Sequence, residues 1–361
     1  MSKMMIKVPA VSRAEIDAWP VKESGLPARV VHCAANMRIG TLGELRSVPD
    51  ERLLAERRFG RRSLVAVEDF LKFCARLEAG RVGFPDLRRT LEYLLPAKSL
   101  EVLTARYGLD RREMDASRNY STLQQIANRD GLTRERVRQV IETAVDGLHT
   151  RMARACLSPY ERMITGEIQR HGGMADADDL ACFAGHPAFG GLNPAASSLL
   201  LCDAHPEHWA YFGHVFVLAP YSQVQAFARA VRHILRRASR PVSREEMLER
   251  VGALPANTPP PDRHAYVSKL LEQMEDVLQF KDGSTVAMDR LPLLLETFMQ
   301  EAGAKATYAR LAGMLNERLL PYCRRSSQSV HRWLTVSGRF QNTGRPGEYA
   351  VRGTTDRIIG G

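Results

Sequence analysis

Four residues near the middle of the chain have the types and spacing of side chains that read DNA bases. Arg134, Glu135, Arg138 and Gln139 follow one another at intervals that place them on one side of a helix. In the major groove, arginine can donate two hydrogen bonds to guanine, and glutamine can pair with adenine. Apolar residues recur three or four positions apart and predict the inward face of the same helix: Val137, Val140, Ile141, Ala144 and Leu148.

A shorter helix is predicted immediately before this one. Ser121 can cap it, and Gln124, three residues later, completes a capping box. Gly131 suits the left-handed residue that ends it. Thr133 can then cap the base-reading helix, and it is also a candidate DNA contact. Ser121–Val140 therefore predicts a helix-turn-helix; the alternative is a solvent-exposed helix in an ordinary small bundle.

The residue string across this motif is more specific than its periodicity. The segments TLQQIA and GLTRERVRQV, with SLEVLTARYGLD at Ser99–Asp110, resemble the fourth conserved region of bacterial housekeeping sigma factors over about residues 99–152. The resemblance implies a helix-turn-helix that reads the −35 promoter element, and it makes RNA polymerase a candidate partner. A longer polar connector, Arg111–Tyr120, departs from the family pattern.

A second set of residues fits the binding of phosphate. In Phe59–Leu64, Gly60 permits a tight turn, and Ser63 can cap a following helix whose free N–H groups attract an anion. Arg61 and Arg62 add positive charge beside that turn. This pattern predicts a helix-hairpin-helix phosphate clamp; the alternative is a hairpin used only for protein docking.

The wider stretch Val21–Leu77 resembles the C-terminal domain of the bacterial RNA polymerase alpha subunit, a helix-hairpin-helix domain that contacts the DNA minor groove. The resemblance implies that Arg29 is the main DNA-contacting arginine. It places Gly60, Arg62 and Ser63 at the family's glycine-lysine-serine hairpin. His32 stands where the family has an asparagine, and it is kept as a candidate contact.

The chain after Cys156 repeats one pattern three times. Each unit has three predicted helices and then a hairpin that contains an aromatic residue, and Phe212, Phe280 and Phe340 mark what we interpret as equivalent places. This order is typical of winged helices arranged in tandem; the alternative is an irregular helical array. The third unit gathers candidate DNA contacts around its third helix: Arg324, Arg325, Gln328 and Arg332.

The predicted fold is mostly α-helical, with small β-hairpins in the C-terminal winged-helix-like units. The predicted domains are a flexible arm (1–17), a helix-hairpin-helix domain (18–80), a linker (81–98), a sigma-region-4-like helix-turn-helix (99–155), an acidic winged-helix-like unit (156–222), a second such unit (223–290) and a basic third one (291–353).

Charge is unevenly distributed along the chain. The formal net charge is +10 and the isoelectric point is about 9.5, which favours polyanionic partners. Residues 1–155 carry a net charge of +8, residues 156–222 carry −5, and residues 223–361 carry +7. We therefore expect phosphate contacts from the two basic flanks, and a spacer or docking role for the acidic unit.

Other classes of function find little support in the sequence. No run of residues is long and apolar enough to span a membrane, and the six scattered cysteines favour reduced thiols in a bacterial cytosol or nucleoid. Motifs for nucleotide binding or catalysis are absent, so no enzyme activity and no cofactor are expected. Histidines 171, 186, 205, 208 and 214 lie near Cys182 and Cys202, but these cysteines sit in apolar runs, and no metal site is predicted.

We interpret the sequence as that of a sequence-specific transcription regulator that binds double-stranded DNA, and not as a complete sigma factor. The alternative is a protein-interaction module that docks on RNA polymerase or its regulators, with DNA contact secondary. The oligomeric state, the target sequence and the sign of regulation stay open.

Overall fold

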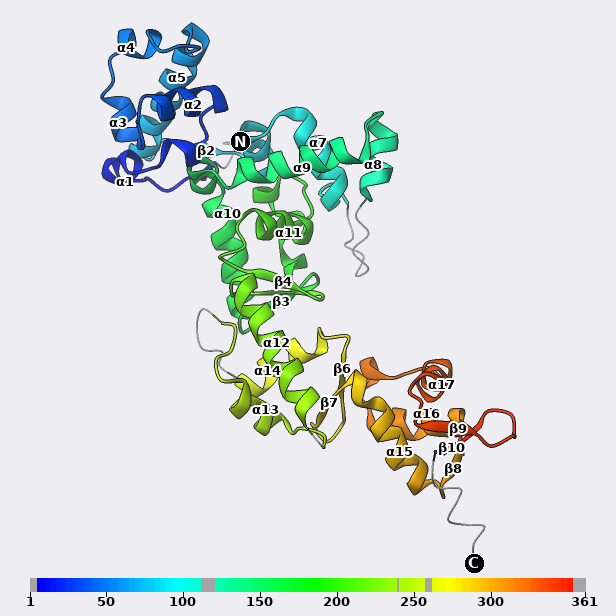
Figure 1. Ribbon diagram of the computed structural model, residues 1–361. Helices are drawn as coiled ribbons and strands as arrows, with labels where there is room; N and C mark the ends of the chain where they lie inside the picture. The colour runs from blue at the N-terminus through cyan, green and yellow to red at the C-terminus, as the bar shows by residue number, and fades with distance from the viewer. Residues whose placement is uncertain (1–4, 112–120, 239, 257–261, 353–361) are drawn as a thin grey trace, which may run out of the picture. The chain divides into compact units, whose positions relative to one another are not determined.

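The computed structural model describes residues 5–111, 121–238, 240–256 and 262–352. The chain divides into two compact units, Met1–Leu218 and Ala219–Gly361 (Figure 1). Both are mainly helical and carry small antiparallel sheets, as predicted. Among the described residues, no helix combines the length and the apolar character that a membrane crossing needs.

Residues 5–84 form a helical module, and its buried core also includes Cys156 from later in the chain. Apolar side chains from α2 and α5, including Val30, Phe70 and Leu77, are buried in it. Its elements are β1 (Ile6–Lys7), α1 (Arg13–Asp17), the 3-10 helix η1 (Val21–Glu23), α2 (Ala28–Asn36), α3 (Leu42–Arg46), α4 (Asp50–Leu54), α5 (Arg61–Glu78) and β2 (Gly83–Phe84).

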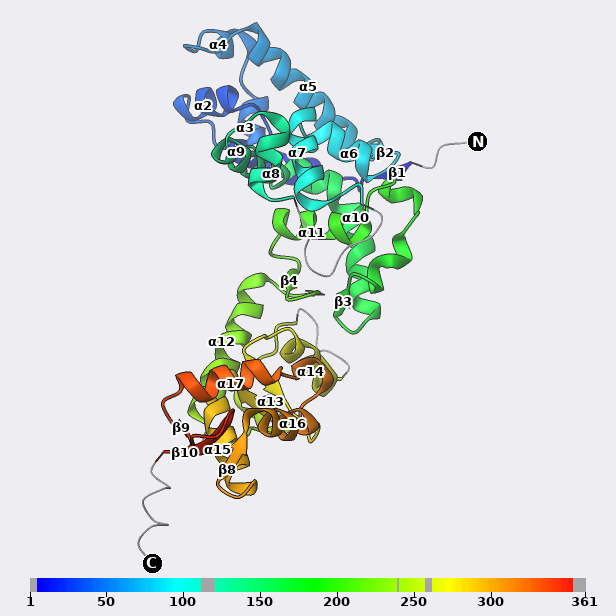
Figure 2. The ribbon, with the colours of Figure 1, turned by 90° about the vertical axis from the view of Figure 1, so that its right-hand side faces the viewer.

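The prediction of a flexible arm at the start of the chain is wrong for residues 5–17. Strand β1 pairs with β2, with Ile6 opposite Phe84 (Figure 2). Val8 and Ile16 are buried in the core of the module. The segment is too short for a periodic pattern to indicate its secondary structure. Its two buried apolar residues nevertheless hold it against the rest of the fold.

The stretch predicted as a linker, residues 81–98, is also structured. It holds β2 and the helix α6 (Leu87–Leu94), which Asp86 caps by accepting a hydrogen bond from the N–H of Arg89 at 2.8 Å. Leu87 and Leu91 are buried in the next core along the chain. The glycine and proline residues of this segment led to the prediction of a linker, although a short amphipathic helix lies between them.

Three helices then form the predicted helix-turn-helix and its leading helix: α7 (Ala97–Tyr107), α8 (Leu123–Asp130) and α9 (Arg134–Leu148). The capping box of α8 lies one residue later than predicted, because Thr122 is the cap and Gln125 its partner. Gly131 ends α8 with φ +65°, and Thr133 caps α9, both as predicted. Most of the connector, residues 112–120, lies outside the described part.

The predicted boundary between residues 155 and 156 falls inside a continuous helix, α10 (Arg151–Arg170). The apolar core of residues 87–218 includes Leu103 of α7 and Leu148 of α9 as well as Tyr160 of α10, so the base-reading helix shares its core with the segment that follows. That segment contains β3 (Met174–Asp176), the 3-10 helices η2 (Asp179–Phe183) and η3 (Pro187–Phe189), α11 (Pro194–Ala204), β4 (Ala210–Phe212) and β5 (Val215–Val217).

The second unit contains two further sets of three helices and a hairpin. Two of the sheets are three-stranded, with strand orders β3-β5-β4 in the first unit and β8-β10-β9 in the second. In each of them, the strand that comes last in the sequence lies in the centre of the sheet. The elements are α12 (Tyr221–Arg237), α13 (Arg244–Val251), α14 (Arg263–Glu272), β6 (Val277–Gln279), β7 (Thr285–Ala287), η4 (Met288–Arg290), α15 (Leu291–Glu301), β8 (Lys305–Thr307), α16 (Tyr308–Arg318), η5 (Pro321–Cys323), α17 (Ser327–Val336), β9 (Phe340–Asn342) and β10 (Glu348–Val351).

The predicted order of helices and hairpins is confirmed in these segments, with two corrections. The helix predicted at Asp178–Ala184 is the 3-10 helix η2. The three marker aromatics do not occupy equivalent positions: Phe212 ends β4, Phe280 follows β6, and Phe340 begins β9.

Candidate nucleic-acid interface

The first turns of α9 expose the four residues that the sequence assigns to base reading. Arg134, Glu135, Arg138 and Gln139 are all exposed. The opposite face carries the predicted apolar residues, of which Val137 belongs to a small core shared with α7 and α8. Packing of that face therefore leaves the four polar side chains, here called the recognition face, directed away from the core.

Arg138 is held by two carboxylates on its own helix. Its Nη2 and Nε donate to Glu135 at 2.6 and 2.9 Å, and Nη1 donates to Glu142. The hydrogen bond that Arg138 donates to Glu135 is the largest cause that raises the pKa of Arg138, and the same bond is the largest cause that lowers the pKa of Glu135. The guanidinium of Arg138, a candidate base contact, is thus already paired with carboxylates of its own helix.

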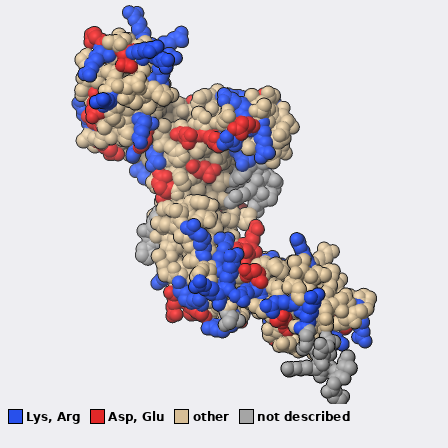
Figure 3. Space-filling model, viewed as in Figure 1, with Lys and Arg blue, Asp and Glu red and all other residues tan. Residues whose placement is uncertain are grey.

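The exposed charges of α9 cancel along its length. The helix exposes three arginines, at 134, 136 and 138, and an equal number of carboxylates, at 135, 142 and 146. Gln139 is also engaged, since its Nε2 donates to Glu135 at 3.3 Å. Helix α9 as a whole therefore offers hydrogen-bonding groups but no excess of positive charge, and Figure 3 shows acidic and basic side chains together over the α7–α9 region.

The turn before α9 is fixed by charged and polar contacts. Thr133 accepts a hydrogen bond from the N–H of Arg136 at 3.1 Å, so its hydroxyl serves the helix start. Asp130 pairs with Arg129 and, at 3.2 Å, with Lys98 of α7. The hydrogen bond from Arg129 is the largest of the causes that lower the pKa of Asp130 from 3.8 to about 2. These contacts set the orientation of α8 and α9 on α7.

The predicted phosphate hairpin lies between α4 and α5. Arg61 and Arg62 are the first two residues of α5, and both are exposed. Gly60 caps the helix with φ −121°, an extended conformation, and no side chain caps it by a hydrogen bond. A Cβ added to Gly60 meets nothing within 4 Å, so the turn itself does not require glycine.

Ser63 was predicted to cap α5, and this is wrong. The helix begins two residues earlier, so Ser63 lies inside it and is 7 % exposed. Its N–H donates to the carbonyl of Gly60 at 2.8 Å. Ser63 therefore supports the start of the helix and offers little to a ligand.

Two further arginines belong to this surface and were missed in the sequence. Arg57 and Arg58 are exposed directly before Phe59, and Arg58 has the left-handed φ of 72°. In the part of the chain that the structure describes, neither they nor Arg61 and Arg62 form an ion pair. The string RRFGRR, in which two arginines stand on each side of Phe59-Gly60, could have revealed them. We call these four residues the arginine hairpin.

Arg29 and His32 lie one turn apart on the exposed face of α2. The buried face of α2 packs against α5 and the hairpin, where the thiol of Cys33 lies 3.8 Å from the carbonyl oxygen of Arg57. The structure therefore brings α2 and the arginine hairpin into one module, as the sequence predicts.

The candidate contacts of the last helix divide into two groups. Arg324, Gln328 and Arg332 are exposed around α17. Arg325 is half-buried, and its Nη2 lies 3.5 Å from the carbonyl oxygen of Glu275 while its Nε is buried without a partner. Arg325 therefore contacts the backbone of its own unit, and its assignment as a DNA contact stays a prediction.

In the histidine-rich segment, His205 has a structural role. Within the described ranges, no group of three or more His, Cys, Asp or Glu residues is arranged to hold a metal ion. His205 is fully buried: its Nε2 donates to the carbonyl of Leu148 at 2.9 Å, and its Nδ1 contacts the carboxylate of Glu161. It therefore joins the end of α9 to α10 and α11. Burial is the leading cause that lowers the pKa of the neighbouring His149.

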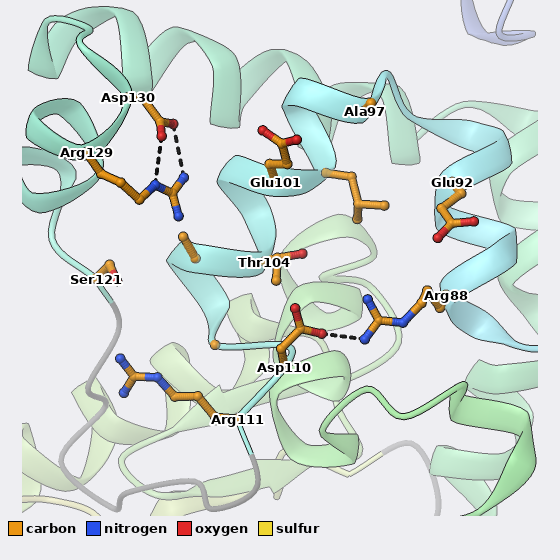
Figure 4. Close-up of a pocket in the computed structure, with 13 residues that line it drawn as sticks. Arg88, Glu92, Ala97, Glu101, Thr104, Asp110, Arg111, Ser121, Arg129 and Asp130 are labelled. Carbon is orange, nitrogen blue, oxygen red and sulfur yellow. Dashed lines mark hydrogen bonds and ion pairs between the residues drawn. The ribbon is translucent and has the colours of Figure 1, made fainter.

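A groove of about 810 Å³ lies beside α7, between α6 and α8 (Figure 4). Its walls carry charges of both signs, and several of them pair with each other, as Arg88 does with Asp110 and Arg129 with Asp130. Paired charges of both signs favour no ligand of one charge, so we assign the groove no ligand.

Comparison with known proteins gives one match. Residues 94–149 match the family model of sigma-70 region 4, a DNA-binding helix-turn-helix involved in promoter recognition. No curated protein and no solved structure matches the chain. The matched segment runs from the end of α6 to the residue after α9 and contains the whole recognition face.

Proposed function

We propose that this chain binds double-stranded DNA with sequence preference, acts in transcription, and reads promoter-like DNA through α9. One observation carries the proposal. The segment that matches sigma-70 region 4 exposes Arg134, Glu135, Arg138 and Gln139 in the first turns of α9. The N-terminal residues of recognition helices contact base edges in the major groove.

Reading requires an exchange of partners on α9. Arg138 leaves Glu135 and Glu142 to donate to a guanine, and the freed Glu135 can accept from a cytosine amino group. Exposed ion pairs contribute little net stability, so the exchange costs little. A wrong base leaves both charges without a partner in the groove, which adds to the discrimination.

The other modules supply contacts to the phosphate backbone in this proposal. The arginine hairpin, together with Arg29 and His32, forms a helix-hairpin-helix clamp related to the alpha-subunit domain. The segments after residue 155 are three winged-helix units, because each has three helices before a hairpin and two have the latest strand in the centre of a three-stranded sheet. Among them, α17 presents Arg324, Gln328 and Arg332 to DNA.

Docking on RNA polymerase is the second candidate function. It rests on the same match, since sigma-70 region 4 is part of the promoter-recognition machinery of that enzyme. The acidic segment gives it little support, because several of its carboxylates are engaged within the fold. Glu161 pairs with His205, Glu167 with Arg170, and Glu207 with Arg154.

The test uses two substitutions of opposite expected effect in the full chain, because α9 shares its core with later residues. Sites selected from random duplexes serve as the preferred DNA. Arg138→Ala should weaken binding to a selected site about tenfold or more and relax the base preference at one position. Glu142→Gln, which removes a competitor of Arg138, should leave the preference intact and strengthen binding a few-fold.

Fluorescence anisotropy with selected and scrambled duplexes measures both effects. Equal affinity of the wild-type chain for the two duplexes contradicts sequence reading. A pull-down of RNA polymerase that withstands high salt, combined with no duplex binding, favours the docking function instead.

A further inference from the structure

Helix α9 alone cannot supply the electrostatic attraction that duplex binding needs. The exposed charges of α9 cancel, as described above, and Arg138 is already paired on both sides. Affinity for duplex DNA comes largely from neutralised phosphates, and it therefore requires surfaces with an excess of positive charge. The second unit contains such a surface on α12, which no function above has used.

Helix α12 has a basic side and no acidic residue in Tyr221–Arg237. Its buried residues, among them Val224, Val231 and Leu235, face the core of the unit. The basic residues on the opposite side are exposed and follow one another at helical spacing: Arg229, His233, Arg236 and Arg237. We call them the α12 stripe, and Figure 3 shows Lys and Arg side chains gathered over this part of the second unit.

Internal pairing consumes only part of this charge. Arg236 pairs with Asp289 at 3.2 Å, and Arg232, at the edge of the stripe, pairs with Asp276 at 2.6 Å. Arg229 and Arg237 form no ion pair within the described ranges of the chain. Arg237 lies in the last turn, where a cation also stabilises the helix, but Arg229 lies two turns earlier and has no such role.

We propose that the α12 stripe binds the sugar–phosphate backbone of double-stranded DNA. The inference rests on the proposed function and adds a second-unit contact that does not read sequence. From Arg229 to Arg237 the helix rises about 12 Å, at 1.5 Å per residue. Phosphates of one strand recur about every 3.4 Å along the duplex axis, so the stripe can face three or four of them.

An anionic membrane surface is the other polyanion that a basic helix can bind. Helices that lie on membranes combine basic residues with large apolar side chains that enter the lipid. The large apolar residues of α12 are buried in the unit, except Tyr221, which is 50 % exposed at the other end of the helix from Arg237. The helix therefore has charge for a backbone but no apolar face for a bilayer.

The experiment is a salt titration of duplex binding by the full chain. The variant Arg229→Ala/Arg237→Ala removes only unpaired charges, so the fold should be unchanged by circular dichroism. Its matched control is Lys305→Ala/Arg310→Ala, which removes two exposed charges of the same unit that form no ion pair among the described residues. The same proteins are also tested with vesicles containing anionic phospholipid.

In the α12 variant, the slope of log affinity against log salt should fall by about 1.8, or 0.9 for each lost contact. The fall should be equal for selected and scrambled duplexes, and the control should keep the wild-type slope. An unchanged slope in the α12 variant, an equal fall in the control, or an effect seen with vesicles alone overturns the inference. Wild-type binding without sequence preference, together with the predicted fall in slope, overturns the proposed function and leaves the α12 contact standing.

Discussion

The fold of the free chain does not require glycine at position 60. Its φ is extended, and its Cα faces open space, so neither backbone strain nor packing explains a glycine there. Between Arg58 and Arg61 it leaves the backbone at the start of α5 accessible. In the proposed clamp, glycine is needed because a phosphate approaches that backbone.

A substitution separates these two explanations. Gly60→Ala should leave thermal unfolding nearly unchanged, since the added methyl group contacts nothing in the free protein. It should weaken duplex binding about tenfold, the effect of losing one hydrogen bond to a charged group. Gly166→Ala, where a Cβ also meets nothing within 4 Å, is the matched control. Wild-type affinity in a folded Gly60→Ala chain would remove the hairpin from the DNA interface.

At the scale of elements, the end of α9 is held by a buried polar junction. The carbonyl of Leu148 can only accept, so Nε2 of His205 carries the proton between them. Glu161 of α10 contacts the other ring nitrogen. Because both partners are buried, removing the ring leaves a carboxylate and a carbonyl without their hydrogen bonds.

His205→Leu should therefore lower the free energy of unfolding of the first unit by about 3 kcal/mol. Replacing both partners, in His205→Leu/Glu161→Leu, should recover much of that loss, because no buried charge then lacks a partner. Urea unfolding followed by near-ultraviolet circular dichroism measures both variants. A double variant less stable than the single one contradicts the view that the orphaned carboxylate causes the loss.

The sequence predicts an element correctly where local residues determine it. It does not predict features that depend on contacts between residues far apart in the chain. Gly131 and Thr133 mark the turn before α9 by local chemistry, and both predictions are confirmed. The continuity of α10 through Pro159, and the core it shares with α9, depend on contacts between residues far apart in the chain. The contact of Arg325 with the backbone of Glu275, fifty positions away, is likewise recorded by no local pattern.

Across the whole molecule, the net charge of a segment predicts contact with DNA less well than the charges that form no internal pair. Asp176 and Asp179 each accept a hydrogen bond from the other's backbone N–H, at 2.9 Å, and Asp203 accepts one from Tyr107 at 2.6 Å. Asp178, by contrast, is exposed and forms no ion pair in the described part of the chain. The segment with a net charge of −5 thus uses much of that charge to hold its own fold.

The last prediction concerns which arginines in and directly before α17 contact DNA. Arg324 and Arg332 are exposed, and among the described residues neither forms an ion pair. The variant Arg324→Gln/Arg332→Gln should lower the slope of log affinity against log salt by about 1.8, because two phosphate contacts are lost. Arg325→Gln removes one charge of the same helix region but should leave the slope unchanged, since that guanidinium is directed toward Glu275.

Asp178→Asn completes this comparison, because it changes the charge of the acidic segment, and the side chain of Asp178 makes no capping hydrogen bond to η2. Its slope should match that of the wild-type chain if the acidic segment lies away from the duplex. Screening acts over about 8 Å at physiological salt, so a carboxylate in contact with phosphate would still be repelled, and its removal would alter the binding. A wild-type slope in the Arg324 and Arg332 variant, with a changed slope for Asp178→Asn, would assign the DNA contact to the acidic segment instead of α17.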